Sequence, residues 1–200
     1  MKNLFVLISV LVFLSCGQRE PLPVISRAEV VDGEKVYEKI RDFSFTNQDS
    51  VEVTNKTFEG KVYIANYFFT TCPSICPPVN REMTRIYDHF ENDDRVGMLS
   101  HTMDTKYDTI PVLKRYAEGL EVEAPKWNFV TGDDKEIFDI AYDYKTSALK
   151  DKQAPGGFDH DDLLLLVDKD RLIRAYAHGT DPKDVDRFIK DIEFLLKSEY

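Results

Sequence analysis

The chain has 200 residues, of which 42% are hydrophobic and 12% aromatic, so it is long enough for one globular domain with a substantial core. It contains 36 acidic and 26 basic residues and has a formal net charge of −10. This charge argues against nucleic acid as a partner, because phosphate binding requires concentrated lysine and arginine. We interpret the negative charge as solubilising, and a surface that attracts cations or a basic face of another protein is the alternative.

The first residues predict a signal peptide. Lys2 gives a positive start, and residues 4–14 form an apolar run that only Ser9 interrupts. A membrane-spanning helix needs about 20 apolar residues, so this run is too short to span a bilayer but suits the core of a signal peptide. We therefore expect residues 1–15 to be removed and the domain to lie outside the cytoplasm.

Cys16 follows the apolar run in the segment FLSCG. The segment resembles a bacterial lipoprotein signal, in which the cysteine becomes the lipidated first residue of the mature chain. The resemblance implies a lipoprotein of the cell envelope that faces the periplasm, anchored to a membrane without spanning it. An ordinary secretory signal with an incidental cysteine is the alternative. Residues 16–37 have no strong periodicity, and we expect the anchor cysteine and a linker there, before a domain of residues 38–200.

The predicted domain begins with strands. Phe43, Phe45, Val51 and Val53 alternate with polar residues on either side of the turn NQDS, which predicts an N-terminal hairpin. The run VYIANYFF at 62–69 is apolar, aromatic and β-branched, which is typical of a strand covered on both faces. The cysteine segment comes directly after this strand.

Helices and strands then alternate. Apolar residues recur at helical spacing over 79–90, and RVGMLS at 95–100 predicts the next strand. Residues 109–119 predict a helix with Pro111 in its first turn and Gly119 at its end.

The second half continues this alternation. WNFVTG at 127–132 predicts a short strand, and residues 137–144 have the spacing of a helix. Residues 163–167 and 171–177 predict a hairpin around the turn DKD. Asp181 is placed to cap a last helix whose apolar residues face the core.

This order of elements predicts an α/β, thioredoxin-like fold, with a central mixed β-sheet flanked by helices and an N-terminal hairpin. The cysteine segment would lie outside the carboxyl end of a parallel strand. Open α/β sheets usually place their functional sites there.

Cys72 and Cys76 lie in the segment YFFTTCPSICPPVN. Their spacing places the Cα atoms about 6 Å apart if the segment is helical, which allows a disulfide, a redox pair or joint coordination of one metal ion. The prolines after the cysteines predict an irregular loop with the regular helix starting near Pro78, and backbone N–H groups at that helix start should lower both thiol pKa values. Thiolates suit copper(I), whereas a structural zinc site normally needs four protein ligands. The spacing by itself leaves the three alternatives open.

Four histidines are candidates for a further ligand. His89 lies on the polar face of a predicted helix, and His101 and His178 follow predicted strands, where an edge residue bonded to its surroundings is the simpler interpretation. His160 lies among acidic residues in the glycine-rich segment APGGFDHDDLLLL, either as an ordinary loop residue or as a metal ligand. As a ligand it would benefit from a carboxylate that accepts the proton of one ring nitrogen, and Asp159 is our candidate.

Four segments in order resemble the Sco/SenC family of copper-binding assembly proteins of respiratory oxidases, over nearly all of residues 41–198. They are FFTTCPSICPP, SHTMDTKYDTIPVLKRYA, WNFVTG and FDHDDLLLLVDKDRLIRAYAHGT. The resemblance implies that Cys72, Cys76 and His160 bind one copper ion. It also implies a role in supplying copper to, or reducing the thiols of, the binuclear copper site of cytochrome c oxidase. Thr105 and Lys106 depart from the usual Pro and Glu of the family.

We therefore predict a membrane-tethered copper chaperone rather than an enzyme. Cys72 and Cys76 would bind copper(I) as thiolates, and His160 would matter more for copper(II). The acceptor would be the copper-bearing subunit of cytochrome c oxidase or another periplasmic copper protein. The alternative is a thiol–disulfide oxidoreductase that reduces an acceptor's cysteines through the same pair, and a peroxidase of peroxiredoxin type is a third and weaker option.

Overall fold

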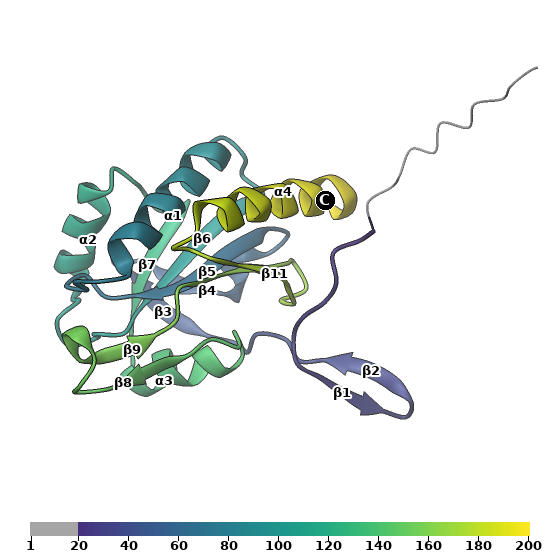
Figure 1. Cartoon of the computed structure of the whole chain (residues 1–200), viewed down its shortest axis with the longest axis horizontal. Helices are drawn as coiled ribbons and strands as arrows, with labels where there is room; N and C mark the ends of the chain where they lie inside the picture. The colour runs from purple at the N-terminus through teal and green to yellow at the C-terminus, as the bar shows by residue number, and fades with distance from the viewer. Residues whose placement is uncertain (1–19) are drawn as a thin grey trace, which may run out of the picture.

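The structure is a computed structural model that describes residues 20–200, and the predicted signal peptide and Cys16 lie outside the described residues. A seven-stranded sheet forms the centre of the domain, in the order β11-β10-β5-β6-β7-β3-β4 (Figure 1). Its strands are β3 (Ser44–Asn47), β4 (Glu52–Thr54), β5 (Val62–Phe68), β6 (Val96–Thr102), β7 (Trp127–Thr131), β10 (Leu163–Val167) and β11 (Ile173–His178).

The sheet is mixed, as predicted. Strand β5 pairs with β6 in parallel and β6 with β7 in parallel, whereas the strands on either side pair antiparallel. Every residue of β5 and β6 is buried. The apolar run that predicted a doubly covered strand therefore forms β5, an interior strand of the sheet, and β3 and β4 form the predicted N-terminal hairpin.

Helices cover both faces of the sheet. The helices are α1 (Cys76–Phe90), α2 (Ile110–Gly119), α3 (Asp134–Asp139) and α4 (Pro182–Glu199), with short 3-10 segments η1 (Asn55–Phe58), η2 (Ile140–Tyr142) and η3 (Pro155–Gly157). Helices α1, α2 and α4 share one buried apolar cluster, and α3 contributes to a second cluster on the other face (Figure 1). Two apolar layers thus enclose the sheet.

Helix α1 begins at Cys76 rather than near Pro78, so the predicted start was two residues late. Pro77 and Pro78 occupy the first turn, where the backbone N–H that proline lacks has no partner within the helix. The prolines that argued for a later start are therefore compatible with this one, and Cys76 lies at the helix N-terminus.

The predicted linker of residues 16–37 contains regular structure in its described part. Ile25 donates its N–H to the carbonyl of Ile173 (2.8 Å), and Ile173 donates its N–H to Ser26 Oγ (2.9 Å), so the chain covers the edge strand β11. Strands β1 (Ala28–Val31) and β2 (Glu34–Tyr37) then form an exposed hairpin that projects from the domain (Figure 1).

The turn of this hairpin was the signal that sequence reasoning missed. Asp32 and Gly33 both have positive φ values, of 51° and 84°. An Asp-Gly pair with both residues at positive φ is typical of a tight hairpin turn. Within residues 20–200, no helix is long and apolar enough to cross a membrane.

Candidate metal centre

The cysteine loop begins where β5 ends, at the carboxyl edge of the parallel strands. Cys72 donates its N–H to the carbonyl of Phe69 (3.1 Å), which bends the chain back before α1. Both cysteines are free thiols. Cys72 is partly exposed, whereas Cys76 is buried against the apolar core below α1. Cys72 is therefore the more accessible of the two cysteines.

His160 comes from a separate small hairpin. Strands β8 (Ala148–Lys150) and β9 (Phe158–His160) pair antiparallel outside the main sheet, where the sequence had predicted only a loop leading into β10. The Phe158 ring packs on the Phe69 ring (centroids 5.1 Å apart), and the His160 ring meets Phe69 edge-on (6.1 Å). Phe69 directly precedes the cysteine loop, so these aromatic contacts bring the hairpin onto that loop.

The side chains of Cys72, Cys76 and His160 converge. One ligand atom from each, two sulfurs and a ring nitrogen, all lie within 4.8 Å of one another. Cys76 Sγ lies 3.9 Å from His160 Nε2. A sulfur and a nitrogen that bind the same ion lie at most about 4.3 Å apart, the sum of a bond of about 2.3 Å to sulfur and one of about 2.0 Å to nitrogen. The Cys76–His160 separation therefore fits a shared metal ion.

The hydrogen bond made by the Nδ1 atom of His160 decides which ring nitrogen is available to bind a metal ion. His160 Nδ1 lies 2.7 Å from the backbone carbonyl of Asp161, and a carbonyl can only accept, so Nδ1 carries the proton. Nε2 is then left with its lone pair toward Cys76. The carbonyl of Asp161 takes the place that we predicted for the carboxylate of Asp159. The Asp161 carboxylate instead accepts hydrogen bonds from Thr146 and Ser147.

The charge state of His160 suits metal binding. Burial lowers the pKa of His160 below its ordinary value, although the Asp161 carbonyl and nearby carboxylates oppose this shift. The ring is therefore neutral at neutral pH. A neutral imidazole is the form that binds a metal ion.

The two thiols differ, which corrects the expectation that the helix start lowers both pKa values. Burial tends to raise the pKa of Cys72, but a hydrogen bond with Cys76 and bonds to the backbone of the loop outweigh it, so the pKa of Cys72 is lowered. Burial raises the pKa of Cys76 well above its ordinary value, and the bond with Cys72 adds to that. Cys72 is therefore the more reactive thiol in the metal-free protein.

The carboxylate of Asp108 holds the start of the cysteine loop in place through hydrogen bonds. Sequence reasoning did not single out this residue. Its buried carboxylate accepts hydrogen bonds from the Thr70 N–H (3.1 Å), the Thr70 hydroxyl and the Thr102 hydroxyl. These bonds tie the start of the cysteine loop to the end of β6. The signal was present in the segment SHTMDTKYDT, where a carboxylate follows a buried strand.

The other three histidines lie away from the cysteines. His89 Nε2 pairs with Glu193 (2.8 Å) and His178 Nδ1 with Asp162 (2.8 Å), as expected of surface residues. His101 is fully buried. It packs among the rings of Phe43, Phe45, Tyr67 and Tyr144. Of the four histidines, His160 is the one that joins the sulfurs in a cluster.

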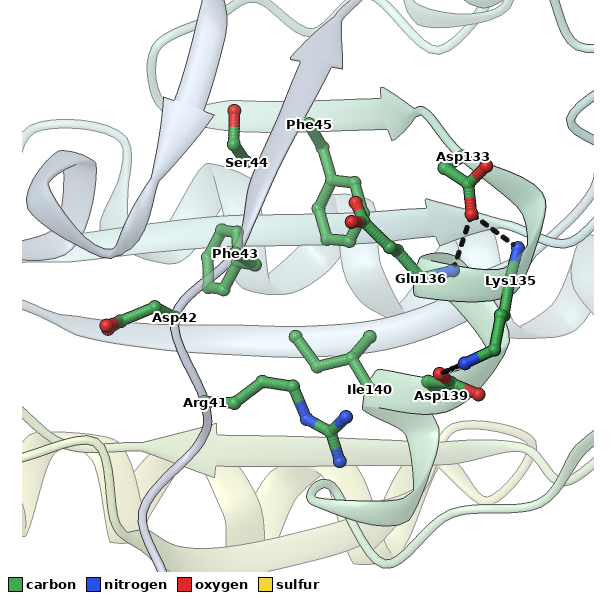
Figure 2. A pocket seen from close by; sticks show the side chains of 10 residues that line it. All are labelled: Arg41, Asp42, Phe43, Ser44, Phe45, Asp133, Lys135, Glu136, Asp139 and Ile140. Atoms are coloured by element: carbon green, nitrogen blue, oxygen red, sulfur yellow. Dashed lines mark hydrogen bonds and ion pairs between the residues drawn. The ribbon is translucent and has the colours of Figure 1, made fainter.

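A hollow of about 800 Å³ lies elsewhere, between the start of β3 and α3 (Figure 2). Its basic side chains are already paired, Arg41 with Asp143 (2.6 Å) and Lys135 with Asp139. Asp133 accepts the N–H groups of the first turn of α3 (Figure 2). These charges satisfy one another, so we place the functional site at the cysteines.

The fold and the site together define a class of protein: a thioredoxin-like domain with two cysteines and a histidine gathered at the carboxyl end of its parallel strands. A family model described as SCO1/SenC matches residues 32–197 of the chain. The chain therefore belongs to the SCO1/SenC family, which confirms the resemblance read from the sequence.

Individual relatives agree with this assignment. The chain is 28% identical over 158 residues to an SCO1 protein homologue of Bacillus subtilis, covering 78% of this chain and 81% of that one. The solved structure of BsSco, described as a member of the Sco family of cytochrome c oxidase assembly proteins, has a TM-score of 0.70 at 25% identity and covers 80% and 95% of the two chains. Bradyrhizobium japonicum ScoI, solved with copper bound, has a TM-score of 0.64 at 25% identity and covers 76% and 98%.

Proposed function

We propose that this protein binds one copper ion through Cys72, Cys76 and His160 and passes it to an acceptor protein. The observation that supports this most is the convergence of the three ligand atoms within 4.8 Å, although Cys76 and His160 lie 84 positions apart in the sequence. Two thiolates suit copper(I), and the added imidazole extends the site to copper(II). The copper-bound structure of the Bradyrhizobium japonicum relative supports copper as the metal.

The proposed role is that of a chaperone rather than an enzyme with turnover. Copper would leave by ligand exchange, in which a thiolate of the acceptor replaces one of the two sulfurs. The partial exposure of Cys72 supports this route, because an incoming ligand can reach that sulfur first. The acceptor we propose is the binuclear copper site of cytochrome c oxidase, and the description of BsSco as a cytochrome c oxidase assembly protein supports the oxidase as the partner.

His160→Ala tests the three-ligand site. We expect reduced protein to take up one copper ion per chain and to show sulfur-to-copper(II) charge-transfer absorption. His160→Ala should weaken copper(II) binding at least tenfold more than copper(I) binding, because copper(I) is held well by the two thiolates. The matched control is His89→Ala, since His89 lies on the surface and pairs with Glu193. Equal copper(II) affinity in the wild type and His160→Ala would refute the site.

A thiol–disulfide oxidoreductase is the second candidate, and the unequal thiols support it. A lowered pKa at Cys72 next to a buried Cys76 is the arrangement of an attacking and a resolving cysteine. His160 distinguishes the two functions, because disulfide exchange does not require it. An oxidoreductase would lose thiol–disulfide exchange with a disulfide peptide in Cys72→Ala and in Cys76→Ala. It would retain this exchange in His160→Ala.

We propose further that lipidation of Cys16 tethers the domain to a membrane of the cell envelope, facing the periplasm. The support is the segment FLSCG after an apolar run of signal-peptide length. Mass analysis of the mature N-terminus tests this directly. A diacylglyceryl-modified Cys16 is the expected result, and a mature chain with unmodified residues at this position would remove the tether.

A further inference from the structure

A groove of about 470 Å³ between α1 and α2 opens onto both sulfurs. Cys72 and Cys76 line it, whereas His160 does not, because His160 reaches the cysteines from the β8–β9 hairpin past Phe69. The β8–β9 hairpin therefore lies on one side of an ion held by the three side chains. The groove gives an acceptor access to the two sulfurs from the side of α1 and α2.

The charge of this groove differs from that of the whole chain. The chain has a formal net charge of −10, yet no carboxylate lines the groove. Within residues 20–200, Arg81 of α1 is the one charged residue that lines it. Among the described residues, Arg81 is exposed and has no ion-pair or hydrogen-bond partner. The groove thus holds an unpaired guanidinium and both sulfurs among its lining groups.

The remaining walls are suited to an extended peptide segment. Tyr116 of α2 stacks on Phe68 of the core (5.3 Å), and its hydroxyl accepts a hydrogen bond from Asn80 of α1. This bond joins α1 to α2 and fixes two of the side chains that line the groove. Pro77 and Leu120 add apolar surface at its sides. A guanidinium in a groove with apolar walls recognises a carboxylate on a segment that also makes apolar contacts.

We propose that this groove docks a segment of the copper acceptor that carries a carboxylate beside its copper-binding thiol. The inference rests on the proposed copper-transfer function and specifies the partner's chemistry. Arg81 pairs with the carboxylate and thereby places the partner's thiol at the sulfurs. Transfer is a ligand exchange: the acceptor thiol loses its proton and forms a bond to copper(I), the bond from copper(I) to Cys72 or Cys76 breaks, and the released thiolate takes up a proton. The oxidation state of copper does not change.

Two synthetic peptides test the proposal. Each carries a pair of cysteines, and they differ only in a glutamate or a lysine beside one cysteine. The measurement is the rate of copper(I) transfer from the loaded full-length protein, together with its copper(I) affinity. We expect transfer to the glutamate peptide to be about tenfold faster, and Arg81→Glu to reverse the preference, because juxtaposed like charges are repelled. The preference should shrink as the ionic strength rises.

Arg115→Glu is the matched control. Arg115 is an exposed arginine of α2, next to Tyr116 in sequence, but it does not line the groove. The Arg115→Glu variant has the same change in net charge as Arg81→Glu and should retain the wild-type preference for the glutamate peptide. Equal effects of Arg81→Glu and Arg115→Glu, or no preference in the wild type, would overturn the proposal.

A steric variant gives an independent readout. Thr84 lines the groove one turn of α1 beyond Asn80. Thr84→Trp should fill the groove and slow transfer to both peptides severalfold while copper affinity stays unchanged. Unchanged transfer rates in this variant would show that the acceptor approaches from another side. If the wild type takes up no copper at all, the proposed function fails rather than the groove.

Discussion

Gly156 lies directly against the ring of Phe69. A Cβ atom at position 156 would lie 2.5 Å from Phe69 Cε2 and 2.7 Å from Cζ, closer than any side chain tolerates. Phe69 precedes the cysteine loop, and Gly156 belongs to η3, which leads into the β9 strand that ends at His160. The contact therefore sets how closely the histidine hairpin approaches the two sulfurs.

Gly156→Ala should push the hairpin away from the cysteine loop and weaken copper(II) binding. Gly157→Ala is a close control, because Gly157 also has a positive φ, 86° against 80°, but has no atom within 4 Å of a Cβ. Both variants carry a similar backbone strain of about 1 kcal/mol, and only Gly156→Ala adds the clash. Copper(II) titrations should show a loss of copper(II) affinity that is at least tenfold larger for Gly156→Ala than for Gly157→Ala. Equal losses would mean that the Phe69 contact does not position His160.

Cys72 should react before Cys76 in reduced, metal-free protein. The pKa of Cys72 is lowered and its side chain is partly exposed, whereas the pKa of Cys76 is raised by burial. Brief treatment with iodoacetamide at neutral pH, followed by peptide mass spectrometry, should find the label mainly on Cys72. In Cys76→Ala the hydrogen bond that lowers the pKa of Cys72 is lost, so the pH midpoint of Cys72 alkylation should rise. Preferential labelling of Cys76 would contradict the assigned asymmetry.

Asp108→Asn should destabilise the fold by about 1–3 kcal/mol, because its buried carboxylate accepts bonds from the Thr70 N–H and from two hydroxyls. An amide keeps one acceptor oxygen but places an NH₂ group where the second oxygen accepted. Asp104→Asn is the control, since Asp104 accepts only a longer bond from the Tyr107 N–H (3.2 Å) near the surface. Urea unfolding of both variants measures the difference. An unchanged urea midpoint of unfolding for Asp108→Asn would show that the hydrogen bonds to Asp108 do not stabilise the fold.

His101 should make the protein sensitive to acid. Burial among aromatic rings lowers its pKa from the ordinary 6.5 to about 4. Between these values the unfolded chain binds a proton that the folded chain does not. The stability contributed by neutral His101 is therefore fully present above pH 6.5 and is lost as the pH falls toward 4, by on the order of 3 kcal/mol.

His101→Phe isolates this contribution, because phenylalanine keeps an aromatic ring next to Tyr67 and cannot be protonated. Urea unfolding of the wild type and the variant at pH 8 and at pH 4.5 gives the two differences in free energy. The wild type should lose more stability than the variant on acidification. Parallel losses in both proteins would place the acid sensitivity elsewhere.

The sequence predicted most of the fold because strands and helices have local signatures. Strand β5 was evident from a run of apolar and β-branched residues, and α4 from Asp181, Pro182 and an apolar stripe. The hairpin of β1 and β2 was missed, although its Asp-Gly turn is a local signal, because its strands are exposed and lack an apolar face. The β8–β9 hairpin was missed because it is short and is held by contacts with Phe69 rather than by its own pattern.

Sequence alone determined which residues have metal-binding chemistry: two thiols four positions apart and a histidine among acidic residues. Only the tertiary structure decided that His160 joins them, because 84 positions separate it from Cys76 and no local pattern encodes that distance. It also decided the details that depend on surroundings. The carbonyl of Asp161 orients the ring. Burial and hydrogen bonding together separate the two thiol pKa values, since solvent exposure and hydrogen-bond partners arise only when distant segments pack together.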